Sequence, residues 1–138
     1  MSMFCNQCEQ TAKGIACTTQ GVCGKDPDTS ALQDLLNYAV MGLSLYAVEA
    51  RKKGYVSNEV NHFTVKSIFS TLTNVDFDPE HFATRIREAV QLRKQLKDKV
   101  KNVTFAHPAA TFTPALDVAG MSEQGMQVSL DSDKDTDA

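Results

Sequence analysis

The chain has 138 residues, enough to bury the core of one domain without help from disulfides, and it carries a formal net charge of −3. Charged residues make up 22% of it, and no cluster of Lys and Arg resembles a nucleic-acid-binding surface, so nucleic acid is not an expected partner. The chain has neither an apolar run of about 18 residues nor the pattern of a secretion signal at its start, so we expect a cytoplasmic protein with no membrane span.

Residues 1–27 contain all four cysteines of the chain: Cys5, Cys8, Cys17 and Cys23. Two, eight and five residues separate them, and no period of 2 or 3.6 runs through the segment. The sequence therefore predicts an irregular loop whose order depends on a bound metal. In a reducing compartment, four thiols are more often metal ligands or redox groups than structural disulfides.

A first helix is predicted to begin near residue 29, because Asp26-Pro27-Asp28-Thr29-Ser30 supplies short oxygen-bearing side chains that can accept from the unpaired amides of a first turn. Basic residues before Gly54 predict its end at about residue 53. Its apolar residues recur at steps of three and four and form one stripe: Leu32, Leu35, Leu36, Ala39, Val40, Leu43, Tyr46, Ala47 and Ala50.

Two further amphipathic helices follow. Ser57 or Asn58 can cap the second helix, and Asp78-Pro79-Glu80 is a start signal for the third, which should run to about residue 102. The apolar face of the second consists of Val60, Phe63, Thr64, Ile68, Phe69 and Leu72. That of the third consists of Phe82, Ile86, Ala89, Val90, Leu92, Leu96, Val100 and Val103.

Three such helices with short connections predict an all-α fold, an antiparallel three-helix bundle preceded by the Cys-rich loop. The pattern weakens beyond residue 105, where His107-Pro108 and Thr113-Pro114 interrupt helices and only a short helix or turn is indicated around 115–121. Residues 131–138 are strongly acidic, as in a tail or in the cap of a further helix of a larger protein. The expected division is a loop over 1–27, a bundle over 28–105 and an irregular segment over 106–138.

Four thiolates satisfy the ligand count of tetrahedral zinc, of a single iron and of an iron–sulfur cluster. Structural zinc sites commonly use two paired C-x2-C units, whereas only one such pair, Cys5 and Cys8, occurs here. The spacing favours a cluster over zinc, and disulfides or unligated thiols are the remaining readings. If the same cysteines hold zinc, the alternative function is a structural, zinc-binding helical interaction module without redox activity.

Several residues between or beside the cysteines could adjust the properties of a bound cluster. Lys13 and Lys25 could moderate the negative charge of four thiolates, and the backbone amides of Gly14, Gly21 and Gly24 could donate to sulfur. The plainer interpretation is that the lysines are exposed and the glycines permit turns.

The chain resembles the N-terminus of the hybrid-cluster protein family, also called prismane proteins or hydroxylamine reductases. The similarity lies in the cysteine spacing and in the residues between the cysteines, and it continues more weakly through the helices. Its segments are Phe4-Cys5-Asn6-Gln7-Cys8-Glu9-Gln10-Thr11-Ala12, Gly14-Ile15-Ala16-Cys17-Thr18, Gly21-Val22-Cys23-Gly24-Lys25, Leu32-Gln33-Asp34-Leu35-Leu36 and Ala109-Ala110-Thr111-Phe112-Thr113.

This resemblance implies a [4Fe–4S] cluster on Cys5, Cys8, Cys17 and Cys23, which passes electrons to a hybrid iron–sulfur–oxygen cluster that reduces hydroxylamine. In the family, His, Glu and Cys residues of later domains bind that second cluster. No cysteine follows Cys23 here, so the hybrid-cluster ligands are absent from these residues.

The three histidines, His62, His81 and His107, cannot replace those ligands, because a hybrid cluster needs several soft donors in one place. The resemblance therefore predicts an electron-transfer module that does not reduce hydroxylamine by itself. Its expected partners are the remaining domains of the protein or a complementary subunit, and a redox donor such as a reductase or a ferredoxin-like protein.

Overall fold

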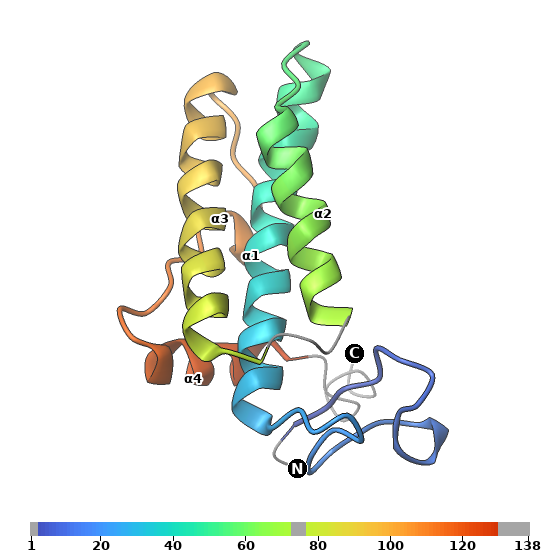
Figure 1. The fold of residues 1–138 in the computed structure, drawn as a ribbon. Coiled ribbons are helices and arrows are strands. Elements are labelled where there is room, and N and C mark those ends of the chain that lie inside the picture. Colours follow the sequence, from blue (N-terminus) through green and yellow to red (C-terminus); the bar gives the residue numbers. More distant parts are fainter. Residues whose placement is uncertain (1–2, 73–76, 130–138) are drawn as a thin grey trace.

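The computed structural model describes residues 3–72 and 77–129 of the chain. Within those residues all regular secondary structure is helical, which confirms the predicted all-α class. The long helices of the bundle run up, down and up in Figure 1: α1 (Pro27–Lys52), α2 (Asn58–Leu72) and α3 (Pro79–Lys99). The acidic residues 131–138 lie outside the described part of the chain.

Aspartate caps followed by proline fix where α1 and α3 begin. The Asp26 carboxylate accepts a hydrogen bond from the Thr29 amide at 2.7 Å, and Pro27 occupies the first helical position. Asp78 likewise accepts from the Glu80 amide at 3.0 Å. The helix starts that the sequence predicts are therefore correct to within two residues.

The end of α3 differs from the prediction, because the helix stops at Lys99 and not near residue 102. Val100 leaves the helical conformation, and Asn102 adopts φ +67, a left-handed conformation that asparagine tolerates better than most residues. Val100 is nevertheless buried and Val103 packs against the core from outside the helix.

The predicted apolar face of α2 is only half correct. Val60 and Phe63 are buried, but Phe69 is 63% exposed and Ile68 and Leu72 are each 44% exposed. The buried stripe continues through Ser67 and Thr71 instead, because steps of three and four residues place positions 60, 63, 67 and 71 on one line along the helix. Positions 68, 69 and 72 fall beside that line.

A further helix, α4 (Val118–Val128), crosses behind the lower part of the bundle and packs mainly on α1 (Figure 1). The sequence indicated only a short helix or turn near 115–121, since two glycines inside the segment weaken its helix propensity. Tertiary packing stabilises the helix: a Cβ atom at Gly125 would overlap the carbonyl group of Ala31 in α1. Asp117 caps α4 by accepting from the Gly120 amide at 2.8 Å.

A second close approach joins α1 to the short 3-10 helix η2 (Pro108–Ala110). Gly42 of α1 meets the backbone of Ala109, whose carbonyl oxygen also accepts a buried hydrogen bond of 3.2 Å from Arg93 of α3. The bundle is thereby tied to the segment after residue 105. None of the helices in the described residues is both long and apolar enough to cross a membrane.

Candidate functional site

The Cys-rich loop lies at the end of the bundle where α1 begins and α2 ends (Figure 1). Its two arms are joined by an isolated antiparallel bridge between Cys5 and Cys17, with N–H to O distances of 3.0 and 2.8 Å. The Thr11 hydroxyl donates to the Cys5 carbonyl at 3.0 Å and tightens the turn between the arms. Backbone hydrogen bonds therefore hold two of the four cysteines beside each other.

A tight turn positions the last cysteine. The Gly21 amide donates to the Lys25 carbonyl at 2.7 Å, and the Gly24 amide donates to the Gly21 carbonyl at 2.9 Å. Cys23 lies inside this turn, and Gly24 and Lys25 connect it to the Asp26 cap of α1. The start of α1 thus anchors the second half of the loop.

All four cysteines line one small cavity, and no disulfide joins them. Cys17 is buried, Cys5 is half-buried, and Cys8 and Cys23 are exposed. The enclosed volume is about 30 Å³. No group of three or more His, Cys, Asp or Glu side chains in residues 3–72 and 77–129 is arranged to hold a single metal ion.

Backbone amides surround the Cys17 sulfur. The Ala12 amide donates to Cys17 Sγ at 3.4 Å, and hydrogen bonding from Ala12, followed by that from the Val22 backbone, lowers the pKa of the Cys17 thiol against the opposing effect of burial. The Thr11 hydroxyl lies 3.7 Å from the same sulfur. A thiolate, the form that ligates metals, is therefore favoured at Cys17.

The amide donors differ from those that the sequence suggested. The amides of Gly14, Gly21 and Gly24 bond to backbone carbonyls within the loop, so they are used in turns, as in the plainer interpretation. Ala12 and Val22 supply the N–H groups at sulfur, and no local pattern marks an alanine or a valine as such a donor.

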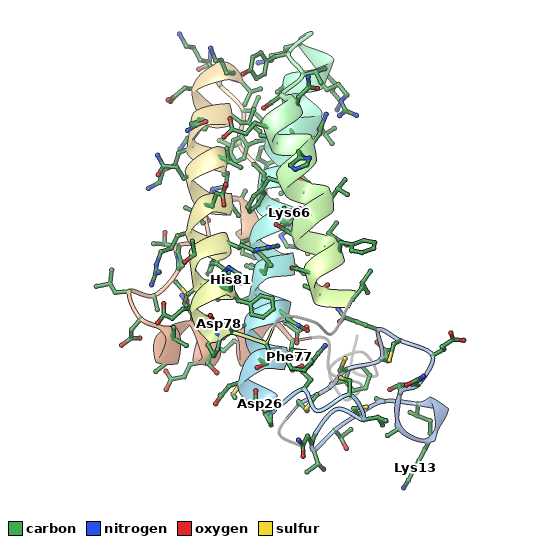
Figure 2. The ribbon with its side chains drawn as sticks, in the orientation of Figure 1. Lys13, Asp26, Lys66, Phe77, Asp78 and His81 are labelled. Atoms are coloured by element: carbon green, nitrogen blue, oxygen red, sulfur yellow. The ribbon has the colours of Figure 1, made fainter. Side chains whose placement is uncertain are left out.

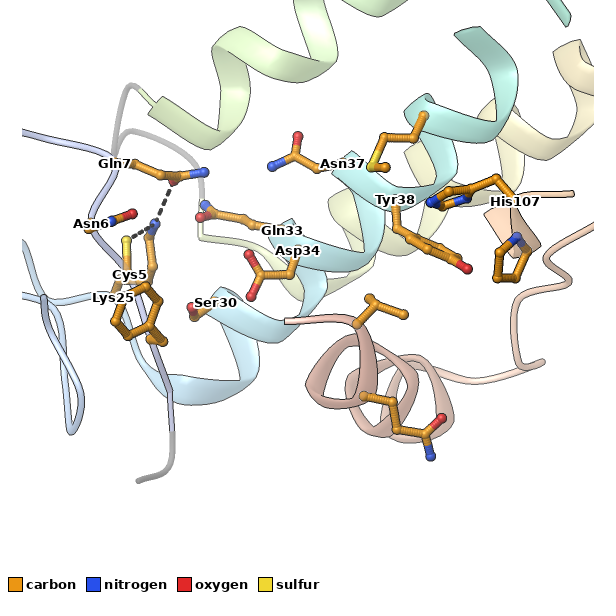
Figure 3. Close-up of a pocket in the computed structure, with 15 residues that line it drawn as sticks. Cys5, Asn6, Gln7, Lys25, Ser30, Gln33, Asp34, Asn37, Tyr38 and His107 are labelled. Carbon is orange, nitrogen blue, oxygen red and sulfur yellow. Dashed lines mark hydrogen bonds between the residues drawn. The ribbon is translucent and has the colours of Figure 1, made fainter. Parts of the chain in front are cut away.

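The two lysines near the cysteines have different surroundings. Lys13 is exposed and extends away from the helices at the tip of the loop (Figure 2). Lys25 is only 2% exposed, and its ammonium group donates to Cys5 Sγ at 3.4 Å and to Gln7 Oε1 at 3.3 Å (Figure 3). Of the two lysines, only Lys25 therefore places its charge on a cysteine sulfur.

A larger cavity of about 440 Å³ adjoins Lys25 and is lined by polar side chains of α1, including Ser30, Gln33 and Asp34 (Figure 3). Neither polar atom of the Gln33 side chain has a hydrogen-bond partner, although both are buried. Burial raises the pKa of Asp34 to about 6, against smaller lowering effects from Ser129 and Lys25. The sequence pattern gave no sign of this polar neighbourhood.

The histidines lie away from the cysteine cavity. His62 is exposed on α2, and His81 is exposed in the first turn of α3. His107 caps η2, where its Nδ1 accepts from the Ala109 amide at 3.1 Å. None of the three lines the cavity formed by the four cysteines.

These features define an all-α protein with a loop of four thiols at one end of a helical bundle. The donor set fits a sulfur-ligated metal or cluster, since soft thiolates, N–H donors at sulfur and a buried cation occur together. Residues 3–133 match the Prismane/CO dehydrogenase family, and the chain belongs to that family. Prismane family proteins bind iron–sulfur clusters.

Similar proteins of known name are hydroxylamine reductases. The chain is 56% identical to that of Methanocella arvoryzae in an alignment 135 residues long that covers 95% of this chain and 25% of the relative. It is 55% identical to that of Syntrophobacter fumaroxidans, again over 95% of this chain and 25% of the relative. For Geobacter sulfurreducens the identity is 41%, over 92% of this chain and 25% of the relative. The chain thus spans about a quarter of the length of these relatives.

Proposed function

We propose that this chain is the electron-transfer module of a hydroxylamine-reductase-like hybrid-cluster protein, with a [4Fe–4S] cluster on Cys5, Cys8, Cys17 and Cys23. The supporting observation is that these four thiols line one cavity at the end of the bundle. When bound, such a cluster supplies one-electron transfer. Electrons would pass to a hybrid-cluster active site outside the 138 residues, so the chain alone is not expected to reduce hydroxylamine.

The residues of this chain have separate tasks in that role. Cys5 and Cys17, joined by their backbone bridge, would supply two ligands, and the amides of Ala12 and Val22 would stabilise negative charge on the Cys17 sulfur. Cys8 and Cys23 are exposed, so a redox donor can approach the cluster on their side. We expect that donor to be a reductase or a ferredoxin-like protein, in the cytoplasm, where free thiols persist.

Iron and acid-labile sulfide analysis of the chain after anaerobic purification tests this proposal. A brown protein with iron and sulfide in the ratio of a [4Fe–4S] cluster, whose colour bleaches on reduction, is the expected result. A colourless protein with stoichiometric zinc would contradict it and would support a zinc-binding interaction module.

An apolar groove supports a second element of the proposal, namely that the remaining domains of the protein pack on this module. The groove encloses about 660 Å³ between α1 and α2. Its lining includes large side chains that are between 44% and 54% exposed: Met41, Val48, Ile68 and Leu72. Exposed apolar surface of this kind is typical of an interface. Because the relatives are about four times as long as the match, the proposed occupant is an apolar surface of their additional chain.

Coexpression tests this interface. The chain is produced with the part of the Methanocella arvoryzae relative that lies beyond the matched region, and copurification is measured. We expect Leu72→Glu to abolish copurification and Val65→Glu to preserve it, since Val65 is 67% exposed but lies outside the groove. Equal binding of both variants would contradict this docking site, and a concentration-dependent homodimer lost only in Leu72→Glu would identify a second copy as the occupant.

A further inference from the structure

Lys25 is a buried cation with an unusual set of partners. The side chain is 2% exposed, yet its ammonium group contacts a cysteine sulfur, Cys5 Sγ at 3.4 Å, and a neutral amide oxygen, Gln7 Oε1 at 3.3 Å. Within the residues that the structure describes, no ion pair within 4.0 Å joins Lys25 to a carboxylate. Asp34 lines the neighbouring cavity, and the charge of Lys25 opposes the larger effect of burial on the pKa of that carboxyl, but the two side chains form no such ion pair.

Burying an ammonium without a negative partner is costly, so a buried lysine without a paired carboxylate indicates that negative charge accumulates beside it. Among residues 3–72 and 77–129, the ionisable group that the Lys25 ammonium contacts is the Cys5 sulfur, which is one of four thiols around a single cavity. Four thiolates that ligate a cluster provide a concentrated negative charge there. Reduction of that cluster by one electron makes the charge more negative still.

We propose that Lys25 sets the reduction potential of the cluster, by holding a fixed positive charge against the Cys5 ligand that stabilises the reduced state more than the oxidised state. This inference rests on the proposed function. The step concerned is a one-electron transfer, in which the external donor is oxidised, the cluster is reduced and no bond to the protein forms or breaks. Lys25 acts through the Cys5 ligand and exchanges no atom with the donor or the cluster, so it is a positioning residue and not a catalytic one.

The fold explains why this lysine, and not another, has the role. Gly21 and Lys25 share a backbone hydrogen bond of 2.7 Å, and Asp26 begins α1 immediately afterwards, so the backbone on both sides of Lys25 is fixed. Gln7 lies between the ligands Cys5 and Cys8, and its amide oxygen holds the ammonium group at the Cys5 sulfur. Lys13, at the exposed tip of the loop, has no comparable anchor (Figure 2).

The test compares the anaerobically reconstituted chain with three variants: Lys25→Met, Lys25→Arg and Lys13→Met. Iron and sulfide content, circular dichroism and the midpoint potential from a dithionite titration followed by visible absorbance are measured for each. Lys25→Met should lower the equilibrium constant of reduction about tenfold, which corresponds to about 59 mV for one electron. Lys25→Arg keeps the positive charge, and Lys13→Met removes an exposed positive charge. Both variants should have midpoint potentials close to that of the unaltered chain.

An unchanged potential in a loaded Lys25→Met variant would overturn the role of Lys25 and leave the proposed function intact. Failure of the unaltered chain to bind iron and sulfide would instead overturn the proposed function, and the inference with it. If Lys25→Met folds but does not retain iron, retention by Lys25→Arg supports the requirement for charge. Loss of iron from both variants would show that Lys25 acts through packing and would overturn the proposal.

Discussion

The Cys5 and Cys17 backbones exchange two hydrogen bonds, of 3.0 and 2.8 Å, across an antiparallel bridge that closes the N-terminal loop. The bridge couples the first cysteine of the sequence to the third, which follows twelve positions later. Backbone pairing therefore preorganises half of the thiol set before any ligand binds. The remaining two cysteines are exposed, and the turn between Gly21 and Lys25 holds one of them, Cys23.

Replacing Cys17 by serine should remove most of the bound iron and sulfide, because it deletes the buried sulfur toward which the Ala12 amide points. The helical circular dichroism signal should persist, since the apolar stripes of the bundle do not include this loop. Thr19→Ser, an exposed change in the same loop, is the control and should retain iron. Collapse of the helical signal together with the iron would show that loop and bundle fold as one unit.

Phe63 and Phe69 provide a matched test of which face of α2 joins the core. Phe63 is 7% exposed and Phe69 is 63% exposed. Phe63→Ala should therefore lower the free energy of unfolding by about 3 kcal/mol, whereas Phe69→Ala should change it by no more than about 0.5 kcal/mol. Urea denaturation measures both values, and similar losses in the two variants would contradict the orientation of α2.

Gly125→Ala tests whether the packing of α4 on α1 outweighs the higher helix propensity of alanine. In an isolated helix the change should be stabilising by about 1 kcal/mol, but here the added Cβ would overlap the Ala31 carbonyl group. Overpacking should prevail and reduce the free energy of unfolding by about 1–3 kcal/mol. Glu123→Ala, on the exposed side of α4, serves as the control. An increase in stability on Gly125→Ala would show that α4 does not pack tightly on α1.

Asp34 should make the protein less stable as the pH rises. Burial raises its pKa from 3.8 to about 6, so the folded state binds the proton more tightly than the unfolded state between these values. The free energy of unfolding contributed by this group therefore falls from about pH 4 to about pH 6 and stays lower above that range. The loss is at most about 3 kcal/mol, and solvent screening reduces it.

Denaturation curves of Asp34→Asn at several pH values measure this contribution. The variant should lack the decline and should be more stable than the unaltered chain at pH 7, because an amide carries no charge to desolvate. Asp98→Asn, at an exposed position on α3, controls for the change in net charge. If the free energy of unfolding of Asp34→Asn fell with pH as much as that of the unaltered chain, other titrating groups would be responsible for the effect.

Much of the fold could be predicted because its signals are local. Asp26-Pro27 and Asp78-Pro79 mark two helix starts through interactions that span only three residues. The apolar steps of three and four residues identify α1 and α3 for the same reason. The stripe on α2 was partly misassigned, because apolar residues surround more of that helix than the bundle covers, and the sequence does not say which of them the bundle contacts.

The candidate site, like the fold, could be predicted only in part from the sequence. The sequence by itself determined the four cysteines, their spacing and hence the kind of group they suit, since ligand chemistry belongs to the residue types. Only the tertiary structure decided that Lys25 is buried against Cys5 while Lys13 is exposed, and that Ala12 and Val22 donate at sulfur. It also decided that α4 returns to α1, where the Ser122 hydroxyl donates to Asp28 at 2.8 Å across 94 residues of sequence. These contacts join segments that are far apart in the sequence, and the residue pattern within one segment does not specify which distant segment it will contact.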